Sequence, residues 1–156
     1  MYQYTICFIK RGQEILMLNR EKAQWMGCWN GVGGKIEVGE TPLQSIIREV
    51  REETGIELAH AEFKGTVTWS VDDSYVGGMY AFIAELPETF DFFTPVKTVE
   101  GILDWKHMDW ILHPENVGMA NLKYFLRHLF DDPNTYDHCF IYRNGRVCDF
   151  ISKPRK

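Results

Sequence analysis

Residues 34–56 read GKIEVGETPLQSIIREVREETGI, and this stretch contains three glutamates that one helix would bring together. Glu49, Glu52 and Glu53 have the spacing i, i+3, i+4, which places their carboxylates on one side of a helix. Like charges at this spacing repel one another unless a cation lies between them. An acidic run is usually only a solvated helix face. However, magnesium binds carboxylate oxygens and substrate phosphates together, so the stretch indicates a metal-dependent enzyme that acts on phosphates.

The same stretch encodes the limits of the helix. Thr41 is a good N-cap, Pro42 suits the first helical position, and Gln44 completes a capping-box pattern. Gly55 is placed to end the helix in a left-handed conformation, after which Ile56 returns to the core. The expected buried stripe consists of Leu43, Ile46, Ile47 and Val50. The glutamate face lies beside that stripe, so the carboxylates should border the core.

The loop before the helix, residues 29–35, reads WNGVGGK and has the features of a phosphate or metal cradle. Its glycines let backbone amides and carbonyls approach a ligand closely, although a Gly-Gly pair is often only a turn. Lys35 could balance phosphate charge, and Glu40 could orient the other carboxylates. Arg48 either pairs with Glu52 at i+4 or braces the loop from behind.

Together these positions match the Nudix box, G-x5-E-x7-R-E-U-x-E-E-x-G-U with U an aliphatic residue, and the chain therefore resembles the Nudix hydrolases. The matching residues are Gly34, Glu40, Arg48, Glu49, Val50, Glu52, Glu53, Gly55 and Ile56. The resemblance implies an α/β/α sandwich with a mixed sheet. It also implies hydrolysis of a nucleoside diphosphate linked to another group, with Mg²⁺ as the cofactor and Mn²⁺ as a possible substitute.

The resemblance further assigns roles to individual residues. The metal ligands that it implies are the carbonyl of Gly33 and the side chains of Glu49, Glu52, Glu53 and Glu100. Glu49 is alternatively the general base that activates the attacking water. Glu40 and Arg48 complete the catalytic set as supporting residues.

Beyond the box, Trp29-Asn30-Gly31 resembles the corresponding loop of the MutT-type 8-oxo-purine nucleoside triphosphatases. The substrate contacts that this resemblance suggests are Thr5, Arg20, Asn30, Gly34, Lys35 and Asn121. One departure concerns residues 117–121, VGMAN, because the animal enzymes carry Trp-Pro-Asp-Asp in that region. Asn121 could substitute in part, since an amide both donates and accepts hydrogen bonds.

We therefore expect a nucleoside triphosphate pyrophosphohydrolase that releases a nucleoside monophosphate and pyrophosphate. The alternatives are a Nudix hydrolase of ADP-ribose, nucleotide sugars or dinucleotide polyphosphates, and a module that binds nucleotides without cleaving them. The undamaged box argues against the binding module.

Composition limits the other classes of function. With 156 residues, 45% of them apolar, the chain is expected to form one globular domain over residues 1–156. A net charge of −5 and a pI near 5.5 argue against a nucleic-acid-binding surface. We expect no membrane span and no signal peptide. The four cysteines lack a disulfide or metal pattern, which favours the cytoplasm. Oligomeric state is not predicted.

Periodicity and turn signals outline the rest of the chain. The expected strands cover 4–9, 14–18, 62–71, 79–84, 104–110, 139–143 and 146–151. We expect a polar loop at 72–78, an irregular segment at 87–95, a helical region from 113 to about 130, and a mobile tail at 152–156. Cys7 and Cys148 are expected in the core, and Cys28 in the substrate-side loop. Trp25 and Trp29 could stack on a base or pack against the sheet, with packing favoured for Trp29.

Overall fold

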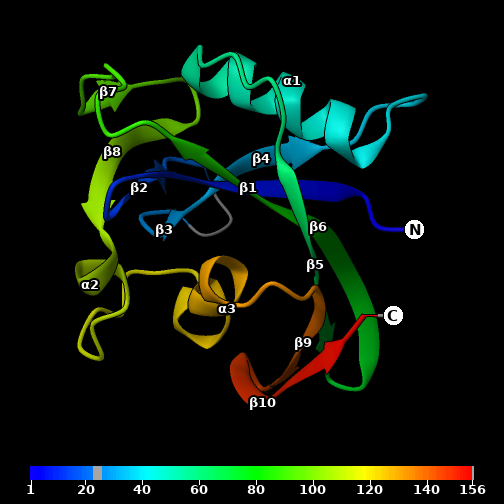
Figure 1. Ribbon diagram of the computed structural model, residues 1–156. Coiled ribbons are helices and arrows are strands. Elements are labelled where there is room, and N and C mark those ends of the chain that lie inside the picture. The colour runs from blue at the N-terminus through cyan, green and yellow to red at the C-terminus, as the bar shows by residue number, and fades with distance from the viewer. Residues whose placement is uncertain (23–25, 156) are drawn as a thin grey trace.

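The computed structural model describes residues 1–22 and 26–155, in which a mixed sheet is covered by helices on both faces (Figure 1). The expected role of Trp25 lies outside the described residues. The strands are β1 (Tyr4–Arg11), β2 (Glu14–Arg20), β3 (Trp29–Asn30), β4 (Val32–Lys35), β5 (Glu62–Val71), β6 (Ser74–Leu86), β7 (Val96–Lys97), β8 (Gly101–His107), β9 (Tyr136–Arg143) and β10 (Arg146–Pro154). The helices are α1 (Pro42–Thr54), α2 (Met108–Ile111), the 3-10 turn η1 (Leu122–Tyr124) and α3 (Leu126–Asp131). Within the described ranges, no helix is both long and apolar enough to cross a membrane.

The strand order of the sheet is β10-β9-β5-β6-β1-β2-β8-β7, with β3 paired to β2 and β4 paired to β1. Two pairs of neighbours are parallel, β1 with β6 and β5 with β9, and the remaining pairs are antiparallel. Because β4 pairs with the central strand β1, the glycine-rich loop rests on the middle of the sheet. The C-terminal hairpin extends the same sheet at one edge.

Helix α1 covers one face of the sheet, and α2, η1 and α3 cover the other (Figure 1). Ile46 and Val50 of α1 are fully buried against residues of β1, β2 and β8, and each contributes about 1.5–3 kcal/mol through burial. On the opposite face, Phe125, Leu126 and Leu129 pack under the sheet. This arrangement confirms the expected α/β/α sandwich with a mixed sheet.

The predicted limits of α1 are also confirmed. The Thr41 hydroxyl accepts a hydrogen bond from Gln44 N at 3.1 Å, and the Gln44 side chain accepts one from Thr41 N at 2.9 Å. Gly55 ends the helix with φ of 79°, which a residue with a side chain rarely adopts. Ile56 is buried, as expected.

The prediction of a polar loop at 72–78 is wrong, because β6 already begins at Ser74. Asp72 and Asp73 alone form the turn, and both have positive φ, 48° and 69°. Aspartate tolerates this left-handed conformation, and a two-residue turn of this kind matches the twist of the flanking strands. The hairpin of β5 and β6 is therefore longer and tighter than the sequence indicated.

The segment around the two later tryptophans also differs from expectation. The strand expected at 104–110 runs from Gly101 to His107, and the next four residues form helix α2, which contains Trp110. The His107 ring accepts a hydrogen bond from Asp109 N at 3.1 Å and so caps that helix.

The prediction that a helix begins at 113–115 is wrong as well, because the described chain is not helical between residues 113 and 121. The side chains of His113 and Asn116 accept hydrogen bonds from Glu115 N and Gly118 N, which competes with helical bonding. Helical structure begins only at Leu122.

The prediction of a mobile tail is wrong for residues 152–155. β10 continues to Pro154, and Arg155 forms an ion pair with Asp137 at 2.8 Å. Cys148 is exposed and not in the core, because a bulge between Val147 and Asp149 interrupts the strand there. Cys7 is fully buried, as expected.

Candidate active site

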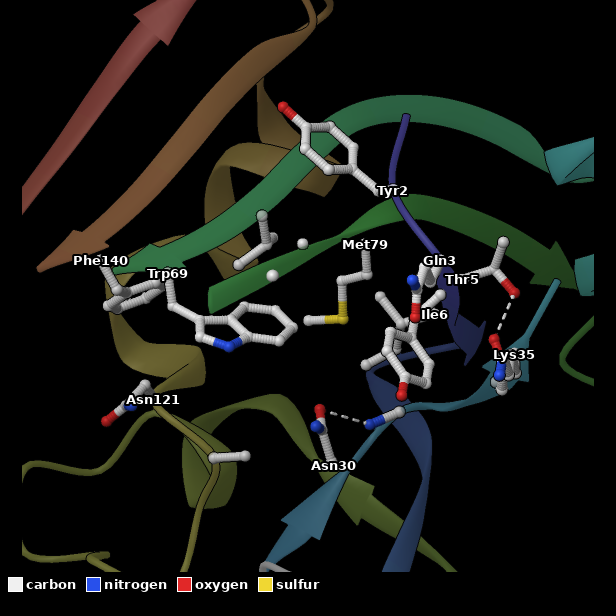
Figure 2. A pocket seen from close by; sticks show the side chains of 18 of the residues that line it. Tyr2, Gln3, Thr5, Ile6, Asn30, Lys35, Trp69, Met79, Asn121 and Phe140 are labelled. Carbon is white, nitrogen blue, oxygen red and sulfur yellow. Dashed lines mark hydrogen bonds between the residues drawn. The ribbon is translucent and has the colours of Figure 1, made fainter. Parts of the chain in front are cut away.

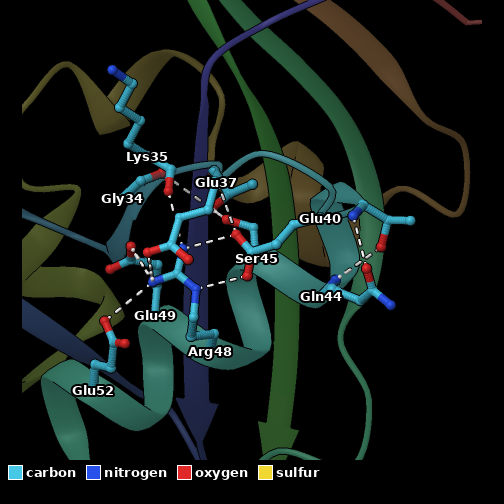
Figure 3. A network of polar contacts seen from close by, with 11 residues as sticks. Gly34, Lys35, Glu37, Glu40, Gln44, Ser45, Arg48, Glu49 and Glu52 are labelled. Atoms are coloured by element: carbon cyan, nitrogen blue, oxygen red, sulfur yellow. Dashed lines mark hydrogen bonds and ion pairs between the residues drawn. The ribbon is translucent and has the colours of Figure 1, made fainter.

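Arg48 is the centre of a polar network between α1 and the loop before it (Figure 3). Its guanidinium donates two hydrogen bonds to Glu40, at 2.7 and 2.9 Å. It also donates to Glu49 at 2.9 Å, to Glu52 at 3.1 Å and to the carbonyl of Lys35 at 3.1 Å. Both alternatives from the sequence therefore occur, since Arg48 pairs with Glu52 and also braces the loop.

The network divides the glutamates into two electrostatic environments. The hydrogen bond from Arg48 holds the pKa of Glu40 below its ordinary value. Burial raises the pKa of Glu49, although Arg48 opposes this shift. Burial and the nearby Glu49 raise the pKa of Glu53 to about 8, even though Glu53 accepts a hydrogen bond from Gly33 N at 3.2 Å. Among the described residues, the charged form of Glu53 thus lacks a partner strong enough to offset its burial.

Close packing makes glycine necessary at two positions of the loop. A Cβ at Gly33 would collide with the backbone of Thr5 on β1. A Cβ at Gly34 would lie 2.5 Å from the Glu49 carboxyl carbon. The loop backbone is therefore held between β1 and the carboxylates of α1 with no room for a side chain.

These groups border a cavity of about 990 Å³, which is large enough for a nucleotide. Ten of the predicted site residues line it, namely Thr5, Arg20, Asn30, Gly33, Gly34, Lys35, Glu49, Glu53, Glu100 and Asn121. Glu40, Arg48 and Glu52 are not among its lining residues. The Glu52 side chain is 57% exposed and faces Arg48, so it lies on the outer side of the network.

The opposite wall of the cavity consists of residues that the sequence did not single out. Figure 2 shows Trp69 and Met79 across the cavity from Lys35, with Phe140 beyond them. Asn30 and Asn121 flank this apolar wall, and Asn121 donates a hydrogen bond to the hydroxyl of Tyr142 at 2.5 Å. The strand pattern of Trp69 was visible in the sequence, but no local signal placed it opposite Phe140.

Two cationic side chains, Arg20 and Lys22, lie near the carboxylates, although only Arg20 of the two lines the cavity. Arg20 Nε is one of two buried side-chain nitrogens that have no hydrogen-bond partner among the described residues. Lys22 bridges to Glu100 at 3.0 Å. An unpaired guanidinium nitrogen beside the carboxylate end of the cavity suits an anionic ligand such as a phosphate.

Comparison with known proteins supports the assignment that this geometry suggests. The family model described as NUDIX domain matches residues 2–129. The chain belongs to the Nudix family. Its members hydrolyse pyrophosphate bonds of nucleotide-linked substrates, and this chain is a Nudix hydrolase.

Several individual proteins are similar to this Nudix hydrolase. An uncharacterised Nudix hydrolase of Bacillus subtilis, YvcI, is 28% identical over 121 residues, which cover 77% of this chain and 73% of that protein. The NAD-capped RNA hydrolase NudC of Pseudomonas aeruginosa is 37% identical over 76 residues, but these cover only 49% of this chain and 27% of NudC. The crystal structure of a mutator MutT protein from Bacillus halodurans matches all of both chains with a TM-score of 0.77 and 26% identity.

Nudix hydrolases use divalent metal ions, and the donor set of this chain fits such an ion. Carboxylates and a backbone carbonyl are hard oxygen ligands, which Mg²⁺ and similar cations prefer. The raised pKa of Glu53 is the expected property of a buried ligand considered without its cation. Three of the expected ligands form ion pairs instead, Glu49 and Glu52 with Arg48, and Glu100 with Lys22. Among the described residues, no group of three acidic, His or Cys side chains is close enough together to bind a metal. The individual ligand roles therefore remain predictions.

Proposed function

We propose that this Nudix hydrolase is a Mg²⁺-dependent pyrophosphohydrolase of nucleoside triphosphates, of the MutT type, that releases a nucleoside monophosphate and pyrophosphate. The observation that carries the proposal is the polarity of the cavity. One end has Glu49, Glu53 and Glu100, and the other end has the apolar surfaces of Trp69 and Met79. A nucleoside triphosphate likewise has a charged end, its phosphates, and a largely apolar end, its base.

At the carboxylate end, the chain supplies groups for binding the phosphates and for moving a proton. Arg20 and Lys35 line this end and would neutralise phosphate oxygens. Glu49 is the proposed general base for the attacking water, because burial raises the pKa of this carboxylate and so makes it a better proton acceptor. With Glu49 as the base, Mg²⁺ bound by Glu52, Glu53, Glu100 and the Gly33 carbonyl would polarise the phosphate oxygens and stabilise the charge that develops there.

At the apolar end, the base would stack on Trp69 and bond with two amides. Asn30 uses its side-chain oxygen to accept from Gly31 N at 2.8 Å, so its amino group is available to a base. Asn121 provides a second uncharged polar group. We propose 8-oxo-purine nucleotides as candidate substrates, with these amides in place of an aspartate pair.

A second candidate is a substrate with two nucleotide halves, such as a dinucleotide polyphosphate. The similarity to NudC favours it, because NudC is described as a hydrolase of NAD-capped RNA. ADP-ribose and nucleotide sugars belong to the same test, since the Nudix box contacts only the diphosphate. The net charge of −5 argues against an RNA chain as the substrate. We place the activity in the cytoplasm, in keeping with four free cysteines.

The deciding experiment compares kcat/KM in Mg²⁺ across normal and 8-oxo nucleoside triphosphates, NAD, a dinucleotide polyphosphate, ADP-ribose and nucleotide sugars. We expect the triphosphates to be cleaved best and to release pyrophosphate and not single phosphate ions. A higher kcat/KM for NAD or a dinucleotide polyphosphate would favour the second candidate. Binding of nucleotides with no product from any of them would contradict both.

A further inference from the structure

A pair of buried hydroxyl groups lies directly behind the glycine loop of the site. Thr5 of β1 is 3% exposed and Ser45 of α1 is completely buried. Their hydroxyl oxygens are 3.4 Å apart, and the Thr5 hydroxyl donates to the carbonyl of Gly34 at 3.3 Å (Figure 2). Figure 3 shows Ser45 on α1 near the loop that carries Gly34. The three groups thus link the central strand, the helix and the loop.

The direction of these hydrogen bonds follows from the number of protons. A carbonyl oxygen only accepts, so the single proton of the Thr5 hydroxyl is used on Gly34. Ser45 must then donate its own proton to Thr5. Both distances are longer than the usual 2.7–2.8 Å for such bonds, so each bond is weak, and the pair acts by orienting groups more than by adding stability.

The Thr5 hydroxyl completes a set of contacts that hold three successive loop residues. Gly33 N donates to Glu53 at 3.2 Å, and the carbonyl of Lys35 accepts from Arg48 at 3.1 Å. Thr5 holds the carbonyl between them, that of Gly34. The side chains that make the first and third contacts, Glu53 and Arg48, belong to the Nudix box, whereas the side chain of the second, Thr5, belongs to β1, outside the box.

A small displacement at this point would reach the carboxylates directly. Gly34 is so close to Glu49 that a Cβ there would lie 2.5 Å from the carboxyl carbon. A rotation of the Gly34 peptide would therefore change the space in which Glu49 meets the substrate. Catalytic groups that are misplaced by about 1 Å lose much of their effect.

We propose that Thr5 and Ser45 are positioning residues, which act through the Gly34 carbonyl to hold the glycine loop against Glu49 and Glu53. This proposal rests on the pyrophosphohydrolase function proposed above. It also gives Thr5 a different role from the substrate contact that the family resemblance suggests, because its hydroxyl is already used inside the protein.

The test compares Thr5→Val, Thr5→Ser and Ser45→Ala with a matched control. Thr66→Val is the control, because Thr66 is also completely buried and its hydroxyl also donates a hydrogen bond, to Asp137 at 2.7 Å between β5 and β9. Thr66 does not line the cavity. The measurements are kcat, KM, the Mg²⁺ concentration for half-maximal activity, and amide hydrogen exchange at residues 33–35.

We expect Thr5→Val to lower kcat about tenfold and to raise the Mg²⁺ requirement, with KM changed less than threefold. Ser45→Ala should have a smaller effect, about two- to threefold in kcat, because Thr5 can still donate to Gly34. Thr5→Ser should keep nearly full activity, since it retains the hydroxyl. Exchange at residues 33–35 should be faster in Thr5→Val than in Thr66→Val.

Equal kcat and equal exchange in Thr5→Val and Thr66→Val would overturn the proposal, and so would a large loss in Thr5→Ser. The exchange measurement needs no substrate. If the unaltered protein cleaves nothing, the proposed function fails, but faster exchange at residues 33–35 in Thr5→Val still supports the positioning role. If Thr5→Val does not fold, Ser45→Ala and Thr5→Ser decide the question by the same comparison.

Discussion

At the scale of single residues, the structure separates two neighbouring glutamates that the sequence treats alike. Glu53 lines the cavity and has a pKa raised to about 8, whereas Glu52 is 57% exposed and bound to Arg48. The spacing of the glutamates predicted a shared helix face, and Arg48 does bridge Glu49 and Glu52. The difference in burial could not be predicted, because it depends on how β1 and β4 cover one side of the helix.

Replacement of Glu53 by Gln should lower kcat by roughly 100-fold or more, because a neutral amide is a poor ligand for Mg²⁺. The free energy of unfolding without metal should rise at pH 7, because a carboxyl whose pKa is raised from 4.5 to about 8 by folding destabilises the fold above pH 4.5, and a neutral amide does not titrate. Glu52→Gln should also remove activity, because Glu52 is a proposed Mg²⁺ ligand. Steady-state kinetics and urea denaturation measure both effects.

Glu57→Gln is the matched control, because Glu57 is exposed and lies just beyond the same helix. It should keep full activity. Unchanged turnover in Glu53→Gln at every Mg²⁺ concentration would contradict the placement of the metal.

His138 makes stability depend on pH in a defined range. Burial lowers its pKa from 6.5 to about 4, with a further contribution from His128, while Asp137 opposes the shift. Between these values the unfolded chain binds the proton and the folded chain does not, so folding is favoured more as pH rises. The contribution is complete above pH 6.5 and is lost as the pH falls towards 4, on the order of 3 kcal/mol in total.

Urea denaturation at several pH values between 4 and 7 measures this dependence. In His138→Phe the part of the slope that belongs to His138 should disappear, because phenylalanine does not titrate. His60→Gln, at an exposed position, should keep the slope of the unaltered protein. Identical slopes in His138→Phe and the unaltered protein would show that His138 is not the responsible group.

At the scale of elements, predictions from sequence succeeded where the determining interactions are local. The limits of α1 depend on Thr41, Gln44 and Gly55, which interact only within the helix. The early start of β6 was missed, because an Asp-Asp turn resembles a loop until its flanking strands are seen to pair. The wall of the cavity was missed for a related reason, since the pairing of Trp69 with Phe140 joins distant segments that no periodicity connects.

The capping box of α1 should contribute measurably to stability. Thr41→Ala removes the acceptor for Gln44 N and should lower the free energy of unfolding by about 1 kcal/mol. Thr89→Ala, in the exposed turn after β6, should cost less than about 0.5 kcal/mol. Equal urea midpoints for these two variants would mean that the cap does not hold the helix end.

At the scale of the whole molecule, bound Mg²⁺ should stabilise the fold, because only the folded chain brings the carboxylates together. A ligand present at 100 times its Kd stabilises by about 2.7 kcal/mol. We therefore expect Mg²⁺ to raise the Tm of the unaltered protein and of Glu57→Gln, and to raise that of Glu53→Gln much less. A chelator should lower the Tm again and abolish activity without unfolding the chain. Equal shifts in all three proteins would place the cation elsewhere.

The C-terminal hairpin lies beyond the residues that match the family model, yet Phe140 and Tyr142 from it line the cavity. We propose that the glutamates of α1 carry bond cleavage, whereas the hairpin contributes to the choice of substrate. Substitutions in the hairpin can change the cavity wall and leave the glutamates of α1 unaltered. A chimera of this chain with the corresponding hairpin of a relative should therefore show the base preference of that relative and keep the cleavage residues of this chain.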